Sequence, residues 1–389
     1  MNNSRISVPE AVSIVLIILV AHTLVSLPKS LLKVTGSATI INLLYVGIIM
    51  FFLVLLIVKL FKGFAGQDII DISNFLGGPI FQKIVGMIFI FYFIFSSSIL
   101  LRNFCECLKT VYYPMTSLFF ILLTFIIALC ISNNFNFSVT AKINLIILPI
   151  IFVSILFIFF ANNQNLSFEN MAPILGNGLF DTFVTGLGNL GAFGGIVFLY
   201  FIPPYLKEPK KFKKVAMISI GLSIVYLIIC VAIILLTFTF LLKVDEIMPL
   251  YSAARYIEFG SFFQRLESIL LLIWIIGMAC YFSITLHITM NIFKKITNIS
   301  DSKPLLVPFA LLMLSISLLP SNYSISKYLE TDIYPRIVIW IGLVLSTLIL
   351  ILAYFKKRIK TFSHNNSQGQ NISSTISKKK GFIGNESMD

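Results

Sequence analysis

The sequence predicts an all-α membrane protein in which ten transmembrane helices form one domain. Residues of the hydrophobic set make up 58% of the 389 residues, and only 12% are charged, whereas soluble domains carry about 25% charged residues. The mean hydropathy is +0.97, and ten separate apolar runs are long enough to be membrane spans. One of these runs carries five glycines within ten residues. Together these features predict a polytopic helical bundle with one unusual span.

Each predicted span is an apolar run bounded by charged or turn-forming residues. A cytoplasmic N-terminal segment, residues 1–10, precedes a transmembrane domain over residues 11–355, whose two halves are about 11–160 and 181–355. The predicted spans are Ala11–Leu27, Ala38–Val58, Ile80–Leu101, Met115–Ile131, Ile143–Phe160, the apolar part of Thr182–Lys214, Val215–Leu242, Ile269–Phe293, Leu305–Leu319 and Ile337–Tyr354.

Three polar segments outside the spans have patterns of their own. The segment 63–78 carries Asp68 and Asp71 and is predicted to be a loop. The connection 243–265 mixes aromatic and charged residues, which predicts a short helix on the outer surface of the membrane. Residues 356–389 are basic, polar and almost free of aromatics, so we expect a disordered cytoplasmic tail.

The basic residues predict that both termini lie in the cytoplasm. With the N-terminus inside, twenty of the 29 lysines and arginines fall in the inside segments, as the positive-inside rule requires. The net charge of +13 is then a topological signal and an attraction to anionic membrane lipid. We expect no nucleic-acid partner.

The glycine-rich sixth span has two interpretations. Its glycines, Gly186, Gly188, Gly191, Gly194 and Gly195, each weaken a helix interior by roughly 0.5–1 kcal/mol relative to alanine. They could mark a backbone that opens at mid-membrane to meet a ligand. Alternatively, the GxxxG spacing could be a small-residue face for close helix packing.

The first span repeats the pattern of the sixth with the opposite orientation. Its patch Ala21-His22-Thr23 is followed by Pro28, just as Gly194 and Gly195 are followed by Pro203. Two five-helix halves, each led by a weakened helix, form an inverted repeat with a ligand site between the leading helices. This second coincidence favours the ligand interpretation.

Four short motifs in this order give the chain a family resemblance. They are Leu27-Pro28-Lys29, the segment 171–178 (MAPILGNG), the segment 201–206 (FIPPYL) before a run of lysines, and the segment 264–268 (QRLES) before Trp274. Over residues 7–360 the chain resembles the B subunit of spore nutrient germinant receptors, a branch of the amino acid–polyamine–organocation (APC) superfamily.

This resemblance implies a fold, a location and partners. The fold would be the 5+5 inverted repeat of the APC type, with helices one and six broken. The protein would be a receptor subunit in the inner membrane of a spore, acting with an A subunit and a lipoprotein C subunit. It would bind a small germinant such as an amino acid and need no cofactor.

The candidate ligand-binding residues follow from both arguments. A reopened helix exposes N–H groups on one half and C=O groups on the other, which suit the carboxylate and ammonium groups of an amino acid. By resemblance, spans three and eight complete the site. The candidates are Ala21, His22, Thr23, Ser96, Ser97, Ser98, Asn189, Ala192, Phe193, Gly194, Gly195, Gly277, Ala279, Cys280 and Tyr281.

Some of these candidates also have an ordinary structural interpretation. Serine hydroxyls in membrane helices commonly bond to their own backbone. His22 is ionisable within a span, which by default points to function; it could contact the ligand, sense pH, or donate to a carbonyl as a neutral histidine. For His287, nearer the inner end of its span, the structural interpretation is favoured.

Absent features narrow the function further. No Asp or Glu falls in the middle third of a predicted span, and the acidic residues are expected in loops or at span ends. The sequence has no phosphate loop, no nucleophile–base constellation and no cysteine spacing for zinc, so we expect neither an enzyme nor a metal site. A receptor subunit is favoured, and a secondary transporter of amino acids or related solutes is the alternative.

Overall fold

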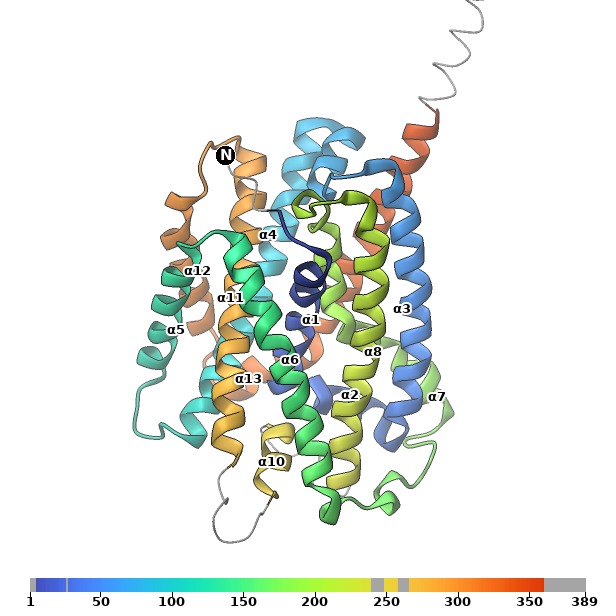
Figure 1. Ribbon diagram of the computed structural model, residues 1–389, viewed down its shortest axis with the longest axis vertical. Coiled ribbons are helices and arrows are strands. Elements are labelled where there is room, and N and C mark those ends of the chain that lie inside the picture. Colours follow the sequence, from blue (N-terminus) through green and yellow to red (C-terminus); the bar gives the residue numbers. More distant parts are fainter. Residues whose placement is uncertain (1–4, 26, 239–247, 258–265, 360–389) are drawn as a thin grey trace, which may run out of the picture.

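The protein is helical throughout the residues that the computed structural model describes, which are 5–25, 27–238, 248–257 and 266–359. Eight helical segments in this part are long and apolar enough to cross a membrane, and two further apolar helices are shorter. Figure 1 shows them standing side by side along the long axis of the molecule. The two shorter helices correspond to the predicted fourth and ninth spans.

The helices follow the predicted spans closely in order, and their bounds differ mostly by a few residues. The main elements are α1 (Val8–Val25), α2 (Leu27–Thr35), α3 (Thr39–Phe61), α4 (Ile69–Val111), α5 (Leu118–Asn133), α6 (Phe137–Ala161), α7 (Leu179–Phe183), η5 (Thr185–Tyr200), α8 (Phe212–Thr237), α10 (Pro249–Arg255), α11 (Leu266–Thr297), α12 (Leu306–Leu318), α13 (Tyr323–Tyr328), η9 (Leu329–Ile333), α14 (Tyr334–Ile337) and η10 (Val338–Leu345).

Helix α1 lies at the centre of the bundle. It packs against α6, α8, α11 and η5, and from Glu10 to Val25 all of its side chains are buried. A helix that is apolar all round fits such a central position. The helix begins at Val8, so the last three residues of the predicted N-terminal segment are helical.

The chain changes direction after α1, but later than predicted. Helix α1 continues through Ala21, His22 and Thr23 to Val25, and α2 begins at Leu27. Residue 26 lies outside the described residues. In Figure 1, α2 runs across the bundle and does not extend the axis of α1. The Thr23 hydroxyl donates to the Leu19 carbonyl at 2.6 Å. The prediction that the backbone opens at Ala21–Thr23 is therefore wrong for this structure.

The glycine-rich stretch forms η5, a long 3₁₀ helix that crosses α1. At Phe193 the backbone leaves helical geometry, with φ −86° and ψ 29°. Its glycines also allow close approach. A Cβ on Gly191 would meet the Cα of Pro335 at 2.6 Å, and a Cβ on Gly194 would overlap the Tyr334 hydroxyl. Both features of this stretch, irregular backbone and tight packing, are thus present together.

At one end of the bundle, α4 begins against α11. Asp68 forms a capping box with Asp71 at the start of α4, and Lys295 of α11 donates to both carboxylates, at 2.6 and 2.7 Å. The predicted loop 63–78 is therefore largely helical from Ile69 onward. Gly78, with φ 75°, then breaks this helix before Pro79, as glycine and proline commonly do at helix ends.

The chain ends of the described part meet neighbouring loops. Ile6 pairs in parallel with Leu206, and its amide donates to the Tyr205 carbonyl at 2.7 Å. The last helix runs on to Ile359, so the first residues of the predicted tail are helical. Lys356 donates to the carbonyls of Phe75 and Leu76. Residues 360–389, predicted to be disordered, lie outside the described residues.

The connection after α8 contains the short helix α10, but this helix is not a surface element. Its first six residues, Pro249 to Ala254, are buried, and it packs against α8 and α11. The expectation of an interfacial helix is wrong for this part. The rest of that prediction, over residues 243–247 and 258–265, lies outside the described residues.

Candidate functional site

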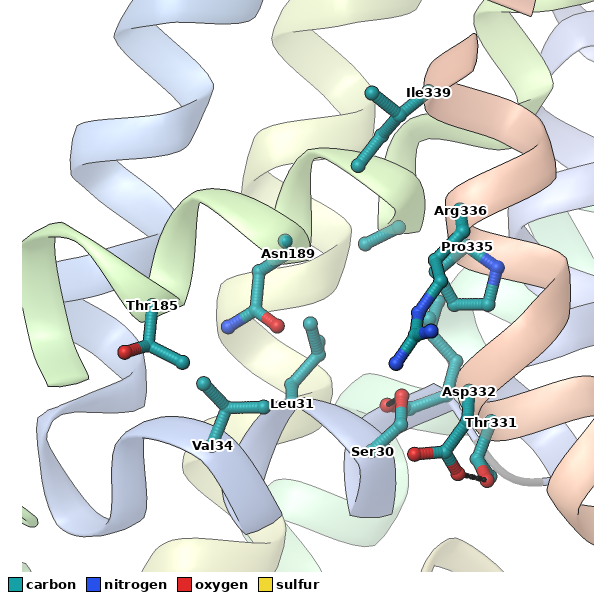
Figure 2. Close-up of a pocket in the computed structure, with 13 residues that line it drawn as sticks. Ser30, Leu31, Val34, Thr185, Asn189, Thr331, Asp332, Pro335, Arg336 and Ile339 are labelled. Atoms are coloured by element: carbon teal, nitrogen blue, oxygen red, sulfur yellow. Dashed lines mark hydrogen bonds between the residues drawn. The ribbon is translucent and has the colours of Figure 1, made fainter. Parts of the chain in front are cut away.

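A pocket of about 260 Å³ opens between α2, η5 and the segment formed by η9, α14 and η10. Its walls mix apolar side chains with opposite charges. Figure 2 shows the side chains of Asn189, Asp332 and Arg336 pointing toward one shared space from different elements. The lining residues are Leu27, Ser30, Leu31, Val34, Thr185, Gly188, Asn189, Ala192, Thr331, Asp332, Pro335, Arg336 and Ile339.

The charges of this pocket are only loosely paired. The Lys33 ammonium lies 3.8 Å from one Asp332 oxygen, and its side chain is 64% exposed. The Thr331 hydroxyl donates to the other Asp332 oxygen at 2.7 Å. A guanidinium and a carboxylate one helical turn apart, both lining one pocket, can bind the opposite charges of a zwitterion.

A second polar cluster, which we call the inner cluster, lies buried next to the pocket. It is centred on His22 of α1, which is 4% exposed. The imidazole stacks on the Tyr334 ring, with centroids 4.3 Å apart and an interplanar angle of 10°. The Tyr281 ring meets it edge-on at 5.7 Å, and the Tyr281 hydroxyl lies 3.0 Å from that of Ser96. A chain of contacts thus runs from Tyr334 through His22 and Tyr281 to Ser96.

Glu330 is the acidic residue of the inner cluster. Its side chain is 3% exposed, and its Oε1 atom lies 3.6 Å from His22 Nδ1. Asn103 of α4 donates one amide hydrogen to Glu330 Oε2 and another to the Ser326 carbonyl. Among the described residues, Oε1 of Glu330 and Nε2 of His22 find no hydrogen-bond partner, and both atoms are buried.

The pocket and the inner cluster share a wall. Glu330 and Tyr334 are one helical turn apart and face the inner cluster. Asp332 and Pro335, from the same segment, face the pocket. A shift of this segment would therefore change both sites at once.

The structure brings together only some of the predicted site residues. Asn189 and Ala192 line the pocket. Asn189 also donates to the Asn42 side chain at 2.7 Å, so one of its amide hydrogens is used in a contact between η5 and α3. His22, Ser96 and Tyr281 belong to the inner cluster, with Gly194 packed on Tyr334.

Other predicted residues have packing roles in this arrangement. The Ser97 hydroxyl bonds to the Phe93 carbonyl one turn earlier, as the ordinary interpretation predicts. A Cβ on Gly277 would lie 2.9 Å from Ile151. Seven further candidates neither line the pocket nor take part in the contacts with His22 described above: Ala21, Thr23, Phe193, Ser98, Gly195, Ala279 and Cys280. His287 stacks on Phe137 at 4.6 Å.

The sequence pattern did not indicate four residues as part of a site: Glu330, Asp332, Tyr334 and Arg336. The run 329–336 reads LETDIYPR, which predicts a loop before the tenth span. The structure places it inside the helical segment Tyr323–Ile359, so Glu330 lies in a helix near one end of that segment and not in a loop. The pair of π-helical turns there, η9 and η10, is the kind of irregularity that often marks functional sites.

Comparisons with known proteins identify the family. The sequence model described as "Spore germination protein" matches residues 5–325. The spore germination protein YndE of Bacillus subtilis (strain 168) is 23% identical over 360 residues, covering 91% of this chain and 98% of that protein.

Two further relatives come from the same organism. Spore germination protein A2 is 24% identical over 301 residues, covering 77% of this chain and 82% of that protein. Spore germination protein KB is 22% identical over 333 residues, covering 83% and 87%. Because the match spans most of the chain, this integral membrane protein belongs to the spore germination protein family.

Proposed function

We propose that this protein is the B subunit of a nutrient germinant receptor in the inner membrane of a spore. It binds a small zwitterionic nutrient, such as an amino acid, and passes a conformational change to an A subunit and a lipoprotein C subunit. It catalyses no reaction. Membership of the spore germination protein family supports the role, and the names of its relatives support a germination system.

The proposal includes a ten-span topology with a 5+5 inverted repeat of the APC type. The two shorter apolar helices, Leu118–Asn133 and Lys303–Leu318, would complete the ten spans. Helices α1 and η5 cross at the centre. The chain changes direction after α1, and the backbone of η5 leaves helical geometry at Phe193. These features support a repeat led by broken helices.

The pocket between α2, η5 and α14 is the site at which we place the nutrient. Its volume of about 260 Å³ is slightly below the range of about 300–1,000 Å³ for drug-sized ligands, which suits a small metabolite. Arg336 would hold the nutrient carboxylate, and Asp332 would hold its ammonium group.

The test is binding to the full-length protein in lipid nanodiscs. A panel of free L-amino acids is titrated by calorimetry, followed by the N-acetyl and amide derivatives of the best binder. We expect Arg336→Gln and Asp332→Asn each to weaken binding at least tenfold. Arg255→Gln and Glu169→Gln, which change exposed charges outside the pocket, are the matched controls.

Binding of the N-acetyl and amide derivatives shows which group of the nutrient each charged side chain contacts. Arg336→Gln should remove the preference for the free carboxylate, and Asp332→Asn the preference for the free ammonium group. If wild-type protein binds amino acids and both pocket variants bind equally well, the pocket assignment is wrong.

A secondary transporter is a second candidate, favoured by one observation. Transporters driven by protons commonly carry an ionisable group inside the membrane, and Glu330 is buried within a segment long enough to span it. Uptake of the bound amino acid into proteoliposomes containing this protein alone separates the two functions. A receptor subunit should show binding without accumulation.

A further inference from the structure

The contact between His22 and Glu330 poses a charge problem. The two side chains are 4% and 3% exposed, and 3.6 Å separates Nδ1 from Oε1. A carboxylate beside a neutral imidazole leaves one net negative charge inside a span. Burying such a charge without compensation costs several kcal/mol or more, and the Asn103 amide supplies only a dipole.

Among the ion pairs of the described residues, none joins Glu330 to a lysine or arginine within 4 Å. Arg102, on the same helix as Asn103, is paired with Glu106 at 2.9 Å. Lys327 lies over the Tyr323 ring at 5.9 Å and makes no ion pair with Glu330 within 4 Å. The remaining titratable groups around the pair are uncharged phenols and a thiol: Tyr281, Tyr334, Tyr323 and Cys107.

We propose that His22 and Glu330 form a proton-binding site that holds one proton between the imidazole and the carboxyl group. With that proton the pair is neutral overall, as imidazolium and carboxylate or as imidazole and carboxylic acid. Moving the proton between Nδ1 and Oε1 leaves the net charge at zero. Glu330 Oε1, which faces Nδ1, has no hydrogen-bond partner within the described part of the chain, so it is the atom at which the proton alters the hydrogen bonding.

The site is linked to the pocket through the wall that they share. Glu330 faces His22, while Asp332 of the same η9 turn lines the pocket. A ligand that displaces η9 changes the contact between carboxyl and imidazole, so proton affinity and nutrient affinity are coupled in both directions. This coupling rests on the proposed function, whereas the proton site itself does not.

The test reads the proton directly in full-length protein in nanodiscs at neutral pH. Nitrogen-15 NMR reports the protonation of His22, which is one of three histidines; His287→Gln assists the assignment. Infrared spectroscopy reports a carboxylic acid carbonyl. We expect either a His22 imidazolium signal or an acid band, and the signal that is present should disappear in Glu330→Gln.

His22→Gln supplies an independent arm if Glu330→Gln does not accumulate. Without the imidazole, Glu330 must hold the proton alone, so an acid band is expected wherever the wild-type proton resides. Glu106→Gln, which removes a carboxylate already neutralised by Arg102, should leave both signals unchanged. A neutral His22 without an acid band in wild-type protein, or no acid band in His22→Gln, overturns the proposal. Neither result depends on nutrient binding, so the proposed function is tested separately.

Discussion

A Cβ atom on Gly195 of η5 would lie 2.5 Å from the carbonyl oxygen of Val15 in α1. Side chains do not approach backbone oxygen so closely, and the central helix α1 is buried on all sides, so it has little room to retreat. The close crossing of the two central elements therefore depends on glycine at this position.

Gly195→Ala should destabilise the protein by about 1–3 kcal/mol, because overpacking a close contact forces the two backbones apart. Gly195→Leu should prevent normal accumulation in the membrane. Thermal unfolding in detergent and membrane abundance measure the two effects. Gly188→Ala is the matched control, because a Cβ on Gly188 meets no atom within 4 Å. Normal abundance of Gly195→Leu with lost nutrient response would favour an opened backbone instead.

Ala192→Leu should fill part of the pocket, since Ala192 is one of its lining residues. We expect the affinity for the best-binding amino acid to fall at least tenfold, equivalent to about 1.4 kcal/mol. The thermal midpoint should change little, because the new side chain enters open space. Calorimetry and thermal unfolding on the same sample check both statements. Unchanged affinity would place the nutrient elsewhere.

Lys295→Met should destabilise the end of the bundle where α4 begins. Removing the ammonium leaves the buried Asp68 carboxylate without its ion-pair partner, and breaking a buried pair from one side costs about 3–5 kcal/mol. The adjacent Lys294→Met is the control, since no ion pair joins Lys294 to an acidic side chain in the described part. Thermal unfolding of the two variants at neutral pH should differ by several degrees.

The same contact gives a pH dependence with a defined sign. Burial raises the pKa of Asp68 from 3.8 to about 6, against the lowering effect of Lys295. Between about pH 4 and 6 the folded protein therefore binds more protons at Asp68 than the unfolded chain does. As pH falls through that window, Asp68 should increase the free energy of unfolding, and as pH rises that contribution should be lost.

Asp68→Asn isolates this contribution, because an amide does not titrate. The difference in thermal midpoint between wild type and Asp68→Asn should change between pH 7 and pH 4, in favour of the wild type at the lower pH. A difference that is constant across the range would mean that Asp68 titrates alike in folded and unfolded protein.

The helical class and most helix positions could be predicted because they are local properties of the chain. A long apolar run in a membrane must form a helix to satisfy its own backbone. The apolar runs around α3, α6, α8 and α11 therefore predicted these four helices, and the observed helix ends differ from the predicted ones by a few residues. His22 was also recognisable, since an ionisable residue in an apolar run is rare.

Helix ends and breaks depended on contacts that the local pattern does not contain. The polar run 329–336 becomes helical because Glu330 meets His22 and Asn103 from distant helices. Likewise, Asp68 caps the start of α4 together with Asp71 and also pairs with Lys295 of α11. In both cases a charge that reads as a loop signal is accommodated by a partner more than 200 positions away in the chain.

The sequence by itself determined a membrane-embedded helical bundle, one unusual glycine-rich span and a family. Only the tertiary structure decided which polar residues share a site. Tyr281 and Glu330 meet at His22 because α11 and η9 approach α1 there, and Ser96 of α4 adjoins Tyr281. The opposite charges of Asp332 and Arg336 line one pocket. The physical reason is that burial and pairing of charge depend on three-dimensional distance, which apolar periodicity along the chain does not encode.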